Sequence, residues 1–353
     1  MRKVLTLAAM LGGCAPTEVP VAVRIANADP AVTVAALDET APVGTQAQDA
    51  ADDPAIWRNP GDPAASLIVG TDKKAGLYVY GLDGRSRSFV DAGRVNNVDL
   101  RSDVSWGGRT IALVAASDRN DLARAAIALF ELDPATSTLR PLGKVPAGSG
   151  EAYGLCLYRA ADALYAFMVI KDGTIRQIRL SGGAAGPASE VVRTLKLATQ
   201  SEGCAVDEQR GRLYAGEEGR GLWRFDARPD GPVAGTLIAP VDNKRLVADV
   251  EGVAVAPDGR GGGFLVVSSQ GDNAYAVWSL GDERWLGRFR VAAGKLGSTE
   301  ETDGIELQLG AFGPDYPDGL FIAQDGSNPP NAQNFKLVSW ADVIAALKQQ
   351  APR

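Results

Sequence analysis

The chain has 353 residues, and its 43 acidic side chains outnumber its 36 Lys and Arg side chains, which gives a net charge of −7. This acidic balance argues against binding to nucleic acid, which usually requires a cationic face. Histidine is absent, which excludes Ser-His-Asp hydrolases, histidine phosphatases and His-ligated zinc sites. Proton transfer must therefore use carboxylates, Lys, Tyr or metal-bound water, and the abundant carboxylates favour a hard cation.

The first 14 residues have the pattern of an export signal. Arg2 and Lys3 precede an apolar run over residues 4–11 that is too short to span a bilayer. The run ends in Leu-Gly-Gly-Cys14, which is similar to the bacterial lipobox, in which the cysteine carries the lipid. We expect residues 1–14 to be a signal peptide, Cys14 to be lipidated, and the protein to be an exported envelope lipoprotein or secreted. Ordinary signal cleavage beside a chance cysteine is the alternative.

Residues 15–45 are rich in Ala, Val, Pro and Thr, and they predict a tether that leads into a first strand near Ala31–Ala36. The folded domain is expected over residues 46–350. Cys156 and Cys204 lie in apolar, strand-like runs, which favours buried free thiols, with a disulfide between them as the alternative.

One motif occurs six times: a polar or acidic residue, often followed by Gly, then an alternating apolar strand. The intervals between its anchors are 44, 56, 49, 49 and 52 residues, which is typical of one four-stranded blade per repeat. The sequence therefore predicts an all-β, six-bladed β-propeller with four-stranded antiparallel blades, and a single helix near Ala341–Lys348. The anchors are Asp53, Asn97, Tyr153, Glu202, Glu251 and Asp303.

Adjacent antiparallel strands run in opposite directions, so the start of each first strand and the end of each second strand lie on one face of a propeller. Carboxylates predominate at these positions, where they would repel one another unless Ca²⁺ or a similar cation neutralised them. At any single position an acidic residue could instead form a turn or cap. The expected ring contains Asp52, Asp53, Asp99, Glu151, Tyr153, Glu202, Asp249, Glu251 and Asp303 at strand starts, and Lys73, Lys74, Arg119, Lys171, Asp172, Glu217, Glu218, Gln270 and Asp325 at strand ends.

Ordered segments over nearly all of residues 49–340 resemble the β-propeller phytases, also called alkaline phytases. The segments include DAADDPAIW (49–57), GTDKKAGLYVY (70–80), GRVNNVDLR (93–101), LYAGEE (213–218), DVEG (249–252), SSQGDNAYAVW (268–278), TDGIEL (302–307) and NFKLVSW (334–340). The resemblance implies a six-bladed propeller in which calcium ions at the top of the channel bind substrate phosphate and activate the attacking water.

The ring and the resemblance together give three groups of expected site residues. The expected catalytic residues are Lys73, Arg119, Lys171 and Tyr153. The expected substrate-binding residues are Lys73, Lys74, Arg119, Lys171 and Asp172. The expected calcium ligands are Asp52, Asp53, Tyr153, Glu202, Glu218, Asp249, Glu251 and Gln270.

One position departs from the family pattern. Family members usually carry Asp six residues before the Asp of the Thr-Asp-Gly motif, and counting back from Asp303 this position is Gly297. A bridging calcium ligand would then be missing, unless Glu300 or Glu301 in the same loop replaced it.

The expected reaction is calcium-dependent hydrolysis of phytate (myo-inositol hexakisphosphate), bound as its calcium complex, by in-line attack of water without a phosphoenzyme. We expect a monomer with no nucleic-acid partner and with membrane contact only through the N-terminal lipid. A calcium-binding propeller lactonase and a non-catalytic envelope protein that binds phosphorylated ligands are the alternatives. Lys73, Arg119 and Lys171 argue against the lactonase, and release of inorganic phosphate separates an enzyme from a binding module.

Overall fold

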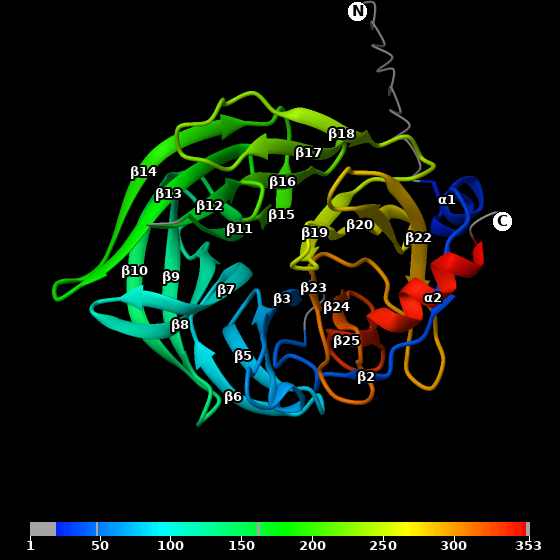
Figure 1. Ribbon diagram of the computed structural model, residues 1–353, viewed down its shortest axis with the longest axis horizontal. Helices are drawn as coiled ribbons and strands as arrows, with labels where there is room; N and C mark the ends of the chain where they lie inside the picture. The colour runs from blue at the N-terminus through cyan, green and yellow to red at the C-terminus, as the bar shows by residue number, and fades with distance from the viewer. Residues whose placement is uncertain (1–18, 47–48, 161–162, 351–353) are drawn as a thin grey trace, which may run out of the picture.

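Six β-sheets surround a central channel in the computed structural model (Figure 1). The structure describes residues 19–46, 49–160 and 163–350. The first three blades are β3 (Ala51–Trp57), β4 (Leu67–Asp72), β5 (Gly76–Gly81) and β6 (Ser86–Asp91); β7 (Val95–Trp106), β8 (Arg109–Asp118), β9 (Arg124–Asp133) and β10 (Thr138–Ser149); and β11 (Ala152–Arg159), β12 (Leu164–Ile170), β13 (Thr174–Gly183) and β14 (Gly186–Lys196).

The next three blades continue the same meander, and the six-bladed all-β propeller is confirmed. They are β15 (Ser201–Asp207), β16 (Arg212–Glu217), β17 (Gly221–Asp226) and β18 (Thr236–Pro240); β19 (Val250–Pro257), β20 (Gly263–Ser269), β21 (Ala274–Ser279) and β22 (Trp285–Val291); and β23 (Ile305–Leu309), β24 (Gly319–Asp325) and β25 (Asn334–Ser339). Two single-turn 3₁₀ helices, η1 (Pro63–Ala65) and η2 (Gln270–Asp272), lie between strands. The expected C-terminal helix is α2 (Trp340–Gln350).

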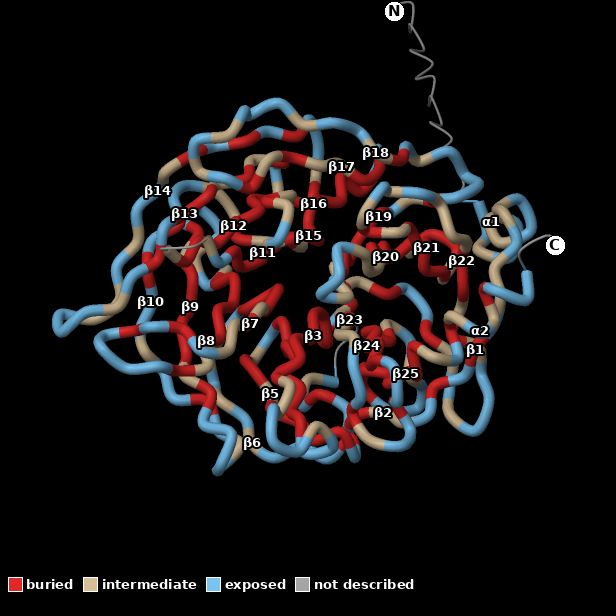
Figure 2. Tube along the Cα trace, viewed as in Figure 1, coloured by how far each residue is buried: buried red, intermediate tan, exposed pale blue. Residues whose placement is uncertain are grey.

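Apolar side chains fill the spaces between neighbouring blades. Six hydrophobic clusters occur, and each joins two adjacent blades, as Leu113 of β8 and Leu157 of β11 do in one cluster. Strands close to the channel are therefore buried on both faces, whereas residues of the outer strands are exposed or half-buried (Figure 2). Full burial of one such leucine contributes about 1.5–3 kcal/mol to stability. Because the side chains between the blades are closely packed, they also fix the spacing between neighbouring blades.

The N-terminal segment closes the propeller. β2 (Asp38–Glu39) pairs antiparallel with β25 and completes the last blade, and β1 (Val32–Val34) adds a parallel fifth strand beside β22. The buried Lys336 ammonium on β25 bonds to Glu39 Oε2 at 2.5 Å, which ties the two ends together. The expected first strand near Ala31–Ala36 is β1, and the described part of the expected tether also contains a helix, α1 (Val21–Asn27), and β2. The pairing of β2 covers an edge of β25 that would otherwise be unpaired.

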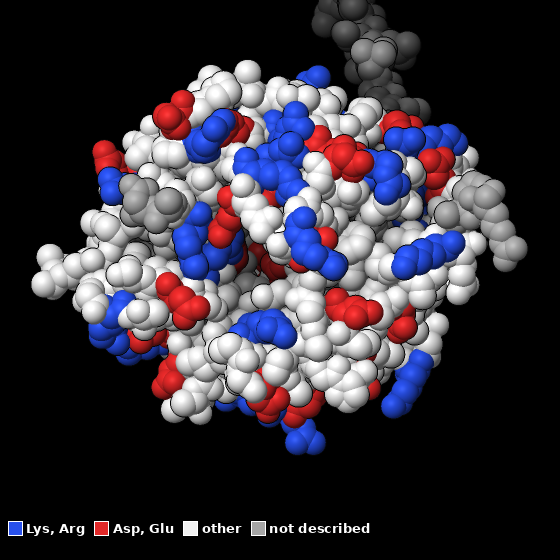
Figure 3. Space-filling view, in the orientation of Figure 1, with Lys and Arg blue, Asp and Glu red and all other residues white. Residues whose placement is uncertain are grey.

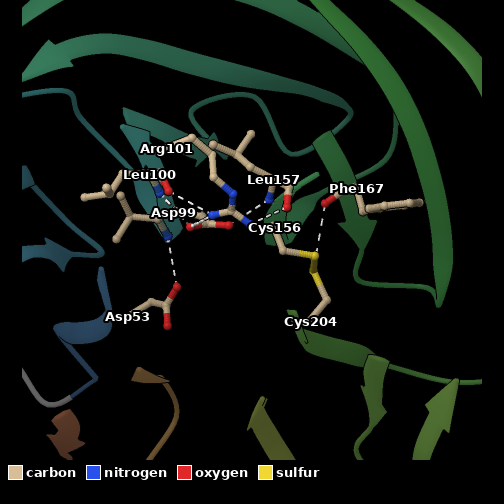
Figure 4. Close-up of a disulfide and its surroundings, with 9 residues drawn as sticks. Asp53, Asp99, Leu100, Arg101, Cys156, Leu157, Phe167 and Cys204 are labelled. Atoms are coloured by element: carbon tan, nitrogen blue, oxygen red, sulfur yellow. Dashed lines mark hydrogen bonds and ion pairs between the residues drawn. A yellow bond between two sulfur atoms is a disulfide. The ribbon is translucent and has the colours of Figure 1, made fainter. Parts of the chain in front are cut away.

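Cys156 of β11 and Cys204 of β15 form a disulfide, with their Cα atoms 5.7 Å apart (Figure 4). The prediction of two free thiols was wrong. The two cysteines are 48 residues apart, close to one repeat, so the propeller places them on the inner strands of neighbouring blades. These inner strands pack side by side without a backbone ladder, and the disulfide links them directly.

The predicted signal peptide and the predicted lipidation site Cys14 lie outside the described residues. Within the three described ranges, no helix has both the length and the apolar character required to cross a bilayer.

Candidate active site

A β-bulge begins five of the six inner strands and brings two consecutive residues to the channel mouth. The register of β3 against β4 shifts between Ala51 and Pro54, which leaves Asp52 and Asp53 outside the ladder. The same shift leaves residues 96–97, 153–154, 202–203 and 251–252 outside the ladders of the next four blades. Bulges re-aim side chains. In these five blades, the repeated anchor of the sequence therefore marks the bulge that turns a polar side chain toward the axis.

The glycine after an anchor allows the next blade to approach. A Cβ atom on Gly203 would lie 2.2 Å from the carbonyl oxygen of Glu251, and one on Gly252 would lie 2.5 Å from that of Asp303. Instead, the Gly252 amide donates a hydrogen bond to the Asp303 carbonyl oxygen at 2.8 Å. Because a side chain at either position would force the strands apart, these glycines keep the carboxylates of neighbouring blades close together.

Three buried carboxylates offer oxygen atoms within 4.8 Å of one another: Glu202, Glu218 and Glu251. Burial raises the pKa of Glu202 well above its usual value, with Asp52 adding to the rise, and raises that of Glu251 in the same way, with Glu202 adding. Burial also raises the pKa of Glu218, to about 7. Glu218 Oε1 and Glu251 Oε2 are buried and have no hydrogen-bond partner among the described residues. A hard cation held between these oxygens would satisfy them and remove the repulsion.

Lys73 lies among carboxylates of two blades. Its ammonium is 3.2 Å from Asp52 Oδ1 and 2.7 Å from Asp303 Oδ2, and it also pairs with Asp49. Burial would lower the pKa of Lys73, but Asp52 and Asp303 together raise it well above its usual value. Burial raises the pKa of Asp52 to about 7, with Asp303 adding to the rise and Lys73 opposing it. Lys73 is therefore a permanent cation next to an acid that can carry a proton near neutral pH.

Arg119 and Lys171 flank the ring of Tyr153. Arg119 Cζ lies 5.6 Å and Lys171 Nζ 4.9 Å from the ring centroid, within the range of cation–π contact. Burial raises the pKa of the Tyr153 hydroxyl, and Glu202 adds to the rise, so the hydroxyl stays protonated. The two cations thus bring positive charge to the ring of Tyr153, whose hydroxyl lies beside Glu202.

Three further predicted residues, Asp53, Gln270 and Asp249, lie around this centre. Asp53 Oδ2 accepts a hydrogen bond from the Val98 amide at 3.0 Å, so Asp53 anchors blade 2 to blade 1. Gln270 Nε2 donates to Asp303 Oδ1 at 2.7 Å. Asp249 is close enough to raise the pKa of Glu218 and Glu251.

Two of the predicted substrate-binding residues lie further out. Lys74 is exposed, and its ammonium is 3.5 Å from Asp49 Oδ2. Asp172 is also exposed, and its carboxylate lies 3.3 Å from the Lys196 ammonium on β14. Partial burial opposes the shift, but hydrogen bonds from Thr174 and the ion pair with Lys196 together lower the pKa of Asp172. The Asp172 carboxylate is therefore ionised.

Asp99 is not in the ring at the channel mouth. It pairs in register with Ala115, midway along β8, and its carboxylate bonds to Arg101 Nη1 at 2.7 Å and to the Leu157 amide at 2.8 Å (Figure 4). Together with Glu306 this pair lines a cavity of about 630 Å³ in the channel. The bulge of β7 lies at residues 96–97, so these residues occupy the channel mouth, and Asp99 lies further along the strand.

Asn96 was missed by sequence reasoning, although it is fully buried within the site. The adjacent Asn97 was recognised only as a repeat anchor. The Asn96-Asn97 doublet corresponds in the repeat to Asp52-Asp53 of blade 1, and this correspondence is the signal that could have identified Asn96.

The charge distribution is consistent with a channel that holds acidic groups inside a more cationic rim. Figure 3 shows a central hollow on the face in view, with acidic side chains at its depth and Lys and Arg side chains around it. Charges inside such a recess are screened less by solvent than charges on the outer surface.

Two comparisons with known proteins identify this arrangement. The family model "Phytase" matches residues 2–352, and a 3-phytase of Bacillus subtilis (strain 168) is 37% identical over 346 residues, which cover 94% of this chain and 90% of that protein. The chain belongs to the phytase family. A solved structure titled "Crystal Structure of Mitotic Checkpoint Complex" covers 95% of this phytase and 85% of its own chain, with a TM-score of 0.49 and 14% identity.

In this phytase, Gly297 faces a buried ammonium. A Cβ atom at Gly297 would lie 3.9 Å from Lys336 Nζ, which is already bonded to Glu39 and lies 3.0 Å from Asp325 Oδ2. The Glu300 amide donates to Asp325 Oδ1 at 3.3 Å, whereas Glu301 is exposed. The loop that carries Gly297 is thus held to the last blade through Asp325, beside a cation supplied by the chain itself.

Proposed function

We propose that this phytase hydrolyses phytate in a calcium-dependent reaction that yields lower inositol phosphates and inorganic phosphate. Buried carboxylate oxygens without hydrogen-bond partners carry the calcium proposal: both oxygens of Asp52, Oε1 of Glu218 and Oε2 of Glu251. Among the described residues, Asp52 Oδ1 lies 3.2 Å from the Lys73 ammonium, and the charge of Lys171 acts on Glu218 without forming an ion pair with it. Several converging anionic oxygens, with no histidine in the chain, fit Ca²⁺ better than softer metals.

The carboxylates of Glu202, Glu218 and Glu251 would hold calcium at the centre, with Tyr153 and Asp249 beside them. Asp52, Asp53 and Gln270 would complete the ligand set on the Asp303 side of the mouth. When bound, Ca²⁺ would supply positive charge that polarises the phosphate and favours ionisation of the attacking water.

The chain's own cations would bind and orient the phosphate that is cleaved. Arg119 and Lys171 both lie against the ring of Tyr153, where their charges can stabilise the negative charge that develops on the phosphate oxygens. Lys73 and the exposed Lys74 would take an adjacent phosphate of the inositol ring. This second contact predicts a preference for substrates with neighbouring phosphates over simple monoesters.

Phosphate release from phytate tests the proposal. The purified protein should release phosphate in calcium, lose this activity in chelator, and recover it when calcium is restored. Lys171→Met should lower kcat/KM, whereas Lys196→Met, which removes an exposed lysine paired with Asp172, should leave it unchanged. Calcium-dependent binding of phytate without phosphate release would instead indicate a binding module. Equal turnover of p-nitrophenyl phosphate and phytate would refute the adjacent-phosphate argument.

We also propose that the protein is exported and anchored through lipid on Cys14. The Cys156–Cys204 disulfide supports export, because structural disulfides persist mainly in oxidising compartments. Incorporation of labelled palmitate into the wild type and its loss in Cys14→Ser would be the expected result; labelling of both proteins would contradict it.

We also propose that the active form is a monomer, because the three glutamates and the cations around Tyr153 already converge within a single propeller. Light scattering on the purified protein tests this, and an active dimer at working concentration would contradict it.

A further inference from the structure

Asn96 lies in the bulge of β7, fully buried between an arginine and a glutamate of the site. Its Oδ1 accepts a hydrogen bond from Arg119 Nη1 at 2.6 Å, and its Nδ2 donates to Glu202 Oε1 at 2.6 Å. One side-chain amide therefore presents its oxygen to a cation and its N–H to a carboxylate. Hydrogen bonds to charged partners are roughly twice as strong as neutral ones, so both contacts restrain the charged groups.

Arg119 is held from a second direction as well. Its other terminal nitrogen, Nη2, pairs with Glu151, which precedes β11, while Asn96 holds Nη1 from β7. Arg119 Nε is buried and has no hydrogen-bond partner within the described part of the chain. Because the guanidinium carries five N–H groups, these two contacts fix its plane and leave donors for a ligand.

Glu202 is held from the same bulge. In one amide orientation Asn97 Oδ1 accepts a hydrogen bond from Asn96 Nδ2 at 3.0 Å; in the other, the Asn97 amide nitrogen donates to Glu202 Oε1 at 3.0 Å and to the Tyr153 carbonyl oxygen at 3.1 Å. If Asn96 were lost, Glu202 could keep Asn97 as a hydrogen-bond donor. Among the described residues, however, Asn97 makes no hydrogen bond to Arg119. The link between the arginine and the glutamate therefore depends on Asn96.

We propose that Asn96 is a positioning residue: a neutral spacer that keeps Arg119 oriented toward phosphate and Glu202 oriented toward calcium, and prevents the two from forming a direct ion pair. The proposal rests on the proposed function. The low dielectric of a buried site strengthens attraction between opposite charges. Without the amide, Arg119 and Glu202 would move toward each other, and one contact would then withdraw both a phosphate ligand and a metal ligand. An aspartate could accept from Arg119 but could not donate to Glu202, so a planar amide suits both partners.

Substitution of Asn96 tests this role with readouts that do not require turnover. Asn96→Leu keeps the branched shape and the number of side-chain heavy atoms without hydrogen bonds, and Asn96→Ala is a second variant if the bulkier leucine disturbs folding. Calcium affinity by titration calorimetry, and affinity for inositol hexasulfate as a polyanion that is not hydrolysed, should each fall about tenfold or more. The control is Asn334→Ala, which truncates another buried asparagine, one that bonds to Glu39, Thr40 and Lys336 and, within the described part of the chain, makes no hydrogen bond to Arg119 or Glu202. It should lower stability without changing either affinity.

Double-mutant cycles separate positioning from general damage. The effect of Asn96→Leu on hexasulfate affinity should largely disappear in an Arg119→Met background, and its effect on calcium affinity should largely disappear in a Glu202→Gln background. Additive losses in both backgrounds, or unchanged affinities in Asn96→Leu, would overturn the proposal.

The cycles also distinguish this proposal from the proposed function. A wild type that binds no calcium would refute the calcium part of the proposed function, and the hexasulfate cycle with Arg119 would still decide the role of Asn96. If the wild type bound neither ligand, the same cycle would be measured on the free energy of unfolding in chelator. Absence of coupling between Asn96 and Arg119 there would refute the spacer.

Discussion

Removal of the Cys156–Cys204 disulfide should destabilise the propeller by an amount that follows from the loop it closes. The bridge joins residues 48 positions apart, and the loop-closure entropy of such a loop in the unfolded chain corresponds to about 4 kcal/mol at 25 °C. With an unfolding entropy of roughly 2 cal/mol/K per residue, a chain of 353 residues should lose about 5 °C in melting temperature. The inner strands also separate more readily once the link is absent, so 4 kcal/mol is the entropic part alone.

The assay is equilibrium unfolding in guanidinium chloride at fixed calcium, with and without a phosphine reductant. Reduction of the wild type should lower the midpoint, and the double variant Cys156→Ala/Cys204→Ala should match the reduced wild type. The double variant also serves as the control, because it retains Cys14 and should not respond to the reductant. A wild type whose midpoint is the same before and after verified reduction would refute the reasoning.

Three other substitutions test the site and the channel. Glu218→Gln should raise the calcium concentration for half-maximal activity about tenfold or more, because it removes one charged ligand of three. The control Glu190→Gln changes an exposed glutamate and should leave this concentration unchanged. Equal calcium dependence of the two variants would contradict the ligand role. Arg119→Lys should raise KM about tenfold in steady-state kinetics, since an ammonium cannot reproduce the planar contacts, and an unchanged KM would count against phosphate binding there. Burial raises the pKa of Glu306 from 4.5 to about 8, with Asp99 adding to the rise, so between these pH values the folded state binds more protons than the unfolded state and stability falls as pH rises. Glu306→Gln should reduce this fall by up to about 1.4 kcal/mol per pH unit in denaturant unfolding at fixed calcium, and parallel stability curves for both proteins would show that the group does not titrate as described.

The architecture was predictable because each repeat carries the same local sequence pattern. An acidic anchor, a glycine and an apolar run recur at blade spacing, and the structure shows why: the bulge turns Glu202 or Glu251 toward the axis, and Gly203 or Gly252 permits the close approach of the next blade. Inner strands are buried on both faces, so their apolar runs are conspicuous in the sequence.

The outermost strands and the closure of the propeller were not predictable in the same way. β6 alternates between exposed and half-buried residues and carries little hydrophobic signal. β2 has two residues, and its partner β25 lies almost 300 residues further along the chain. Its pairing depends on the whole ring having formed, which no local pattern encodes.

Two residues of β7 illustrate how the position of a bulge decides a role. Asp99 and Asn96 belong to the same strand, and both are polar, but the bulge of β7 brings Asn96 to the mouth and leaves Asp99 with Arg101 further along the channel. A bulge adds one residue without a distinctive composition. Sequence spacing alone therefore located the strand end and not the residue that faces the ligands.

The pairing of cations and carboxylates explains how a chain with a net charge of −7 could bind a polyanion under the proposed function. Lys73 is surrounded by Asp49, Asp52 and Asp303, and Arg119 is paired with Glu151. Each cation is therefore largely neutralised, and incoming phosphate would meet the carboxylates at the same time. Calcium bound by the carboxylates would reverse this balance, since it adds positive charge and draws the acidic groups away from the Lys73 ammonium. Metal should consequently bind before the substrate, or together with it as the calcium complex, because the cations become available to phosphate only when the carboxylates have another partner.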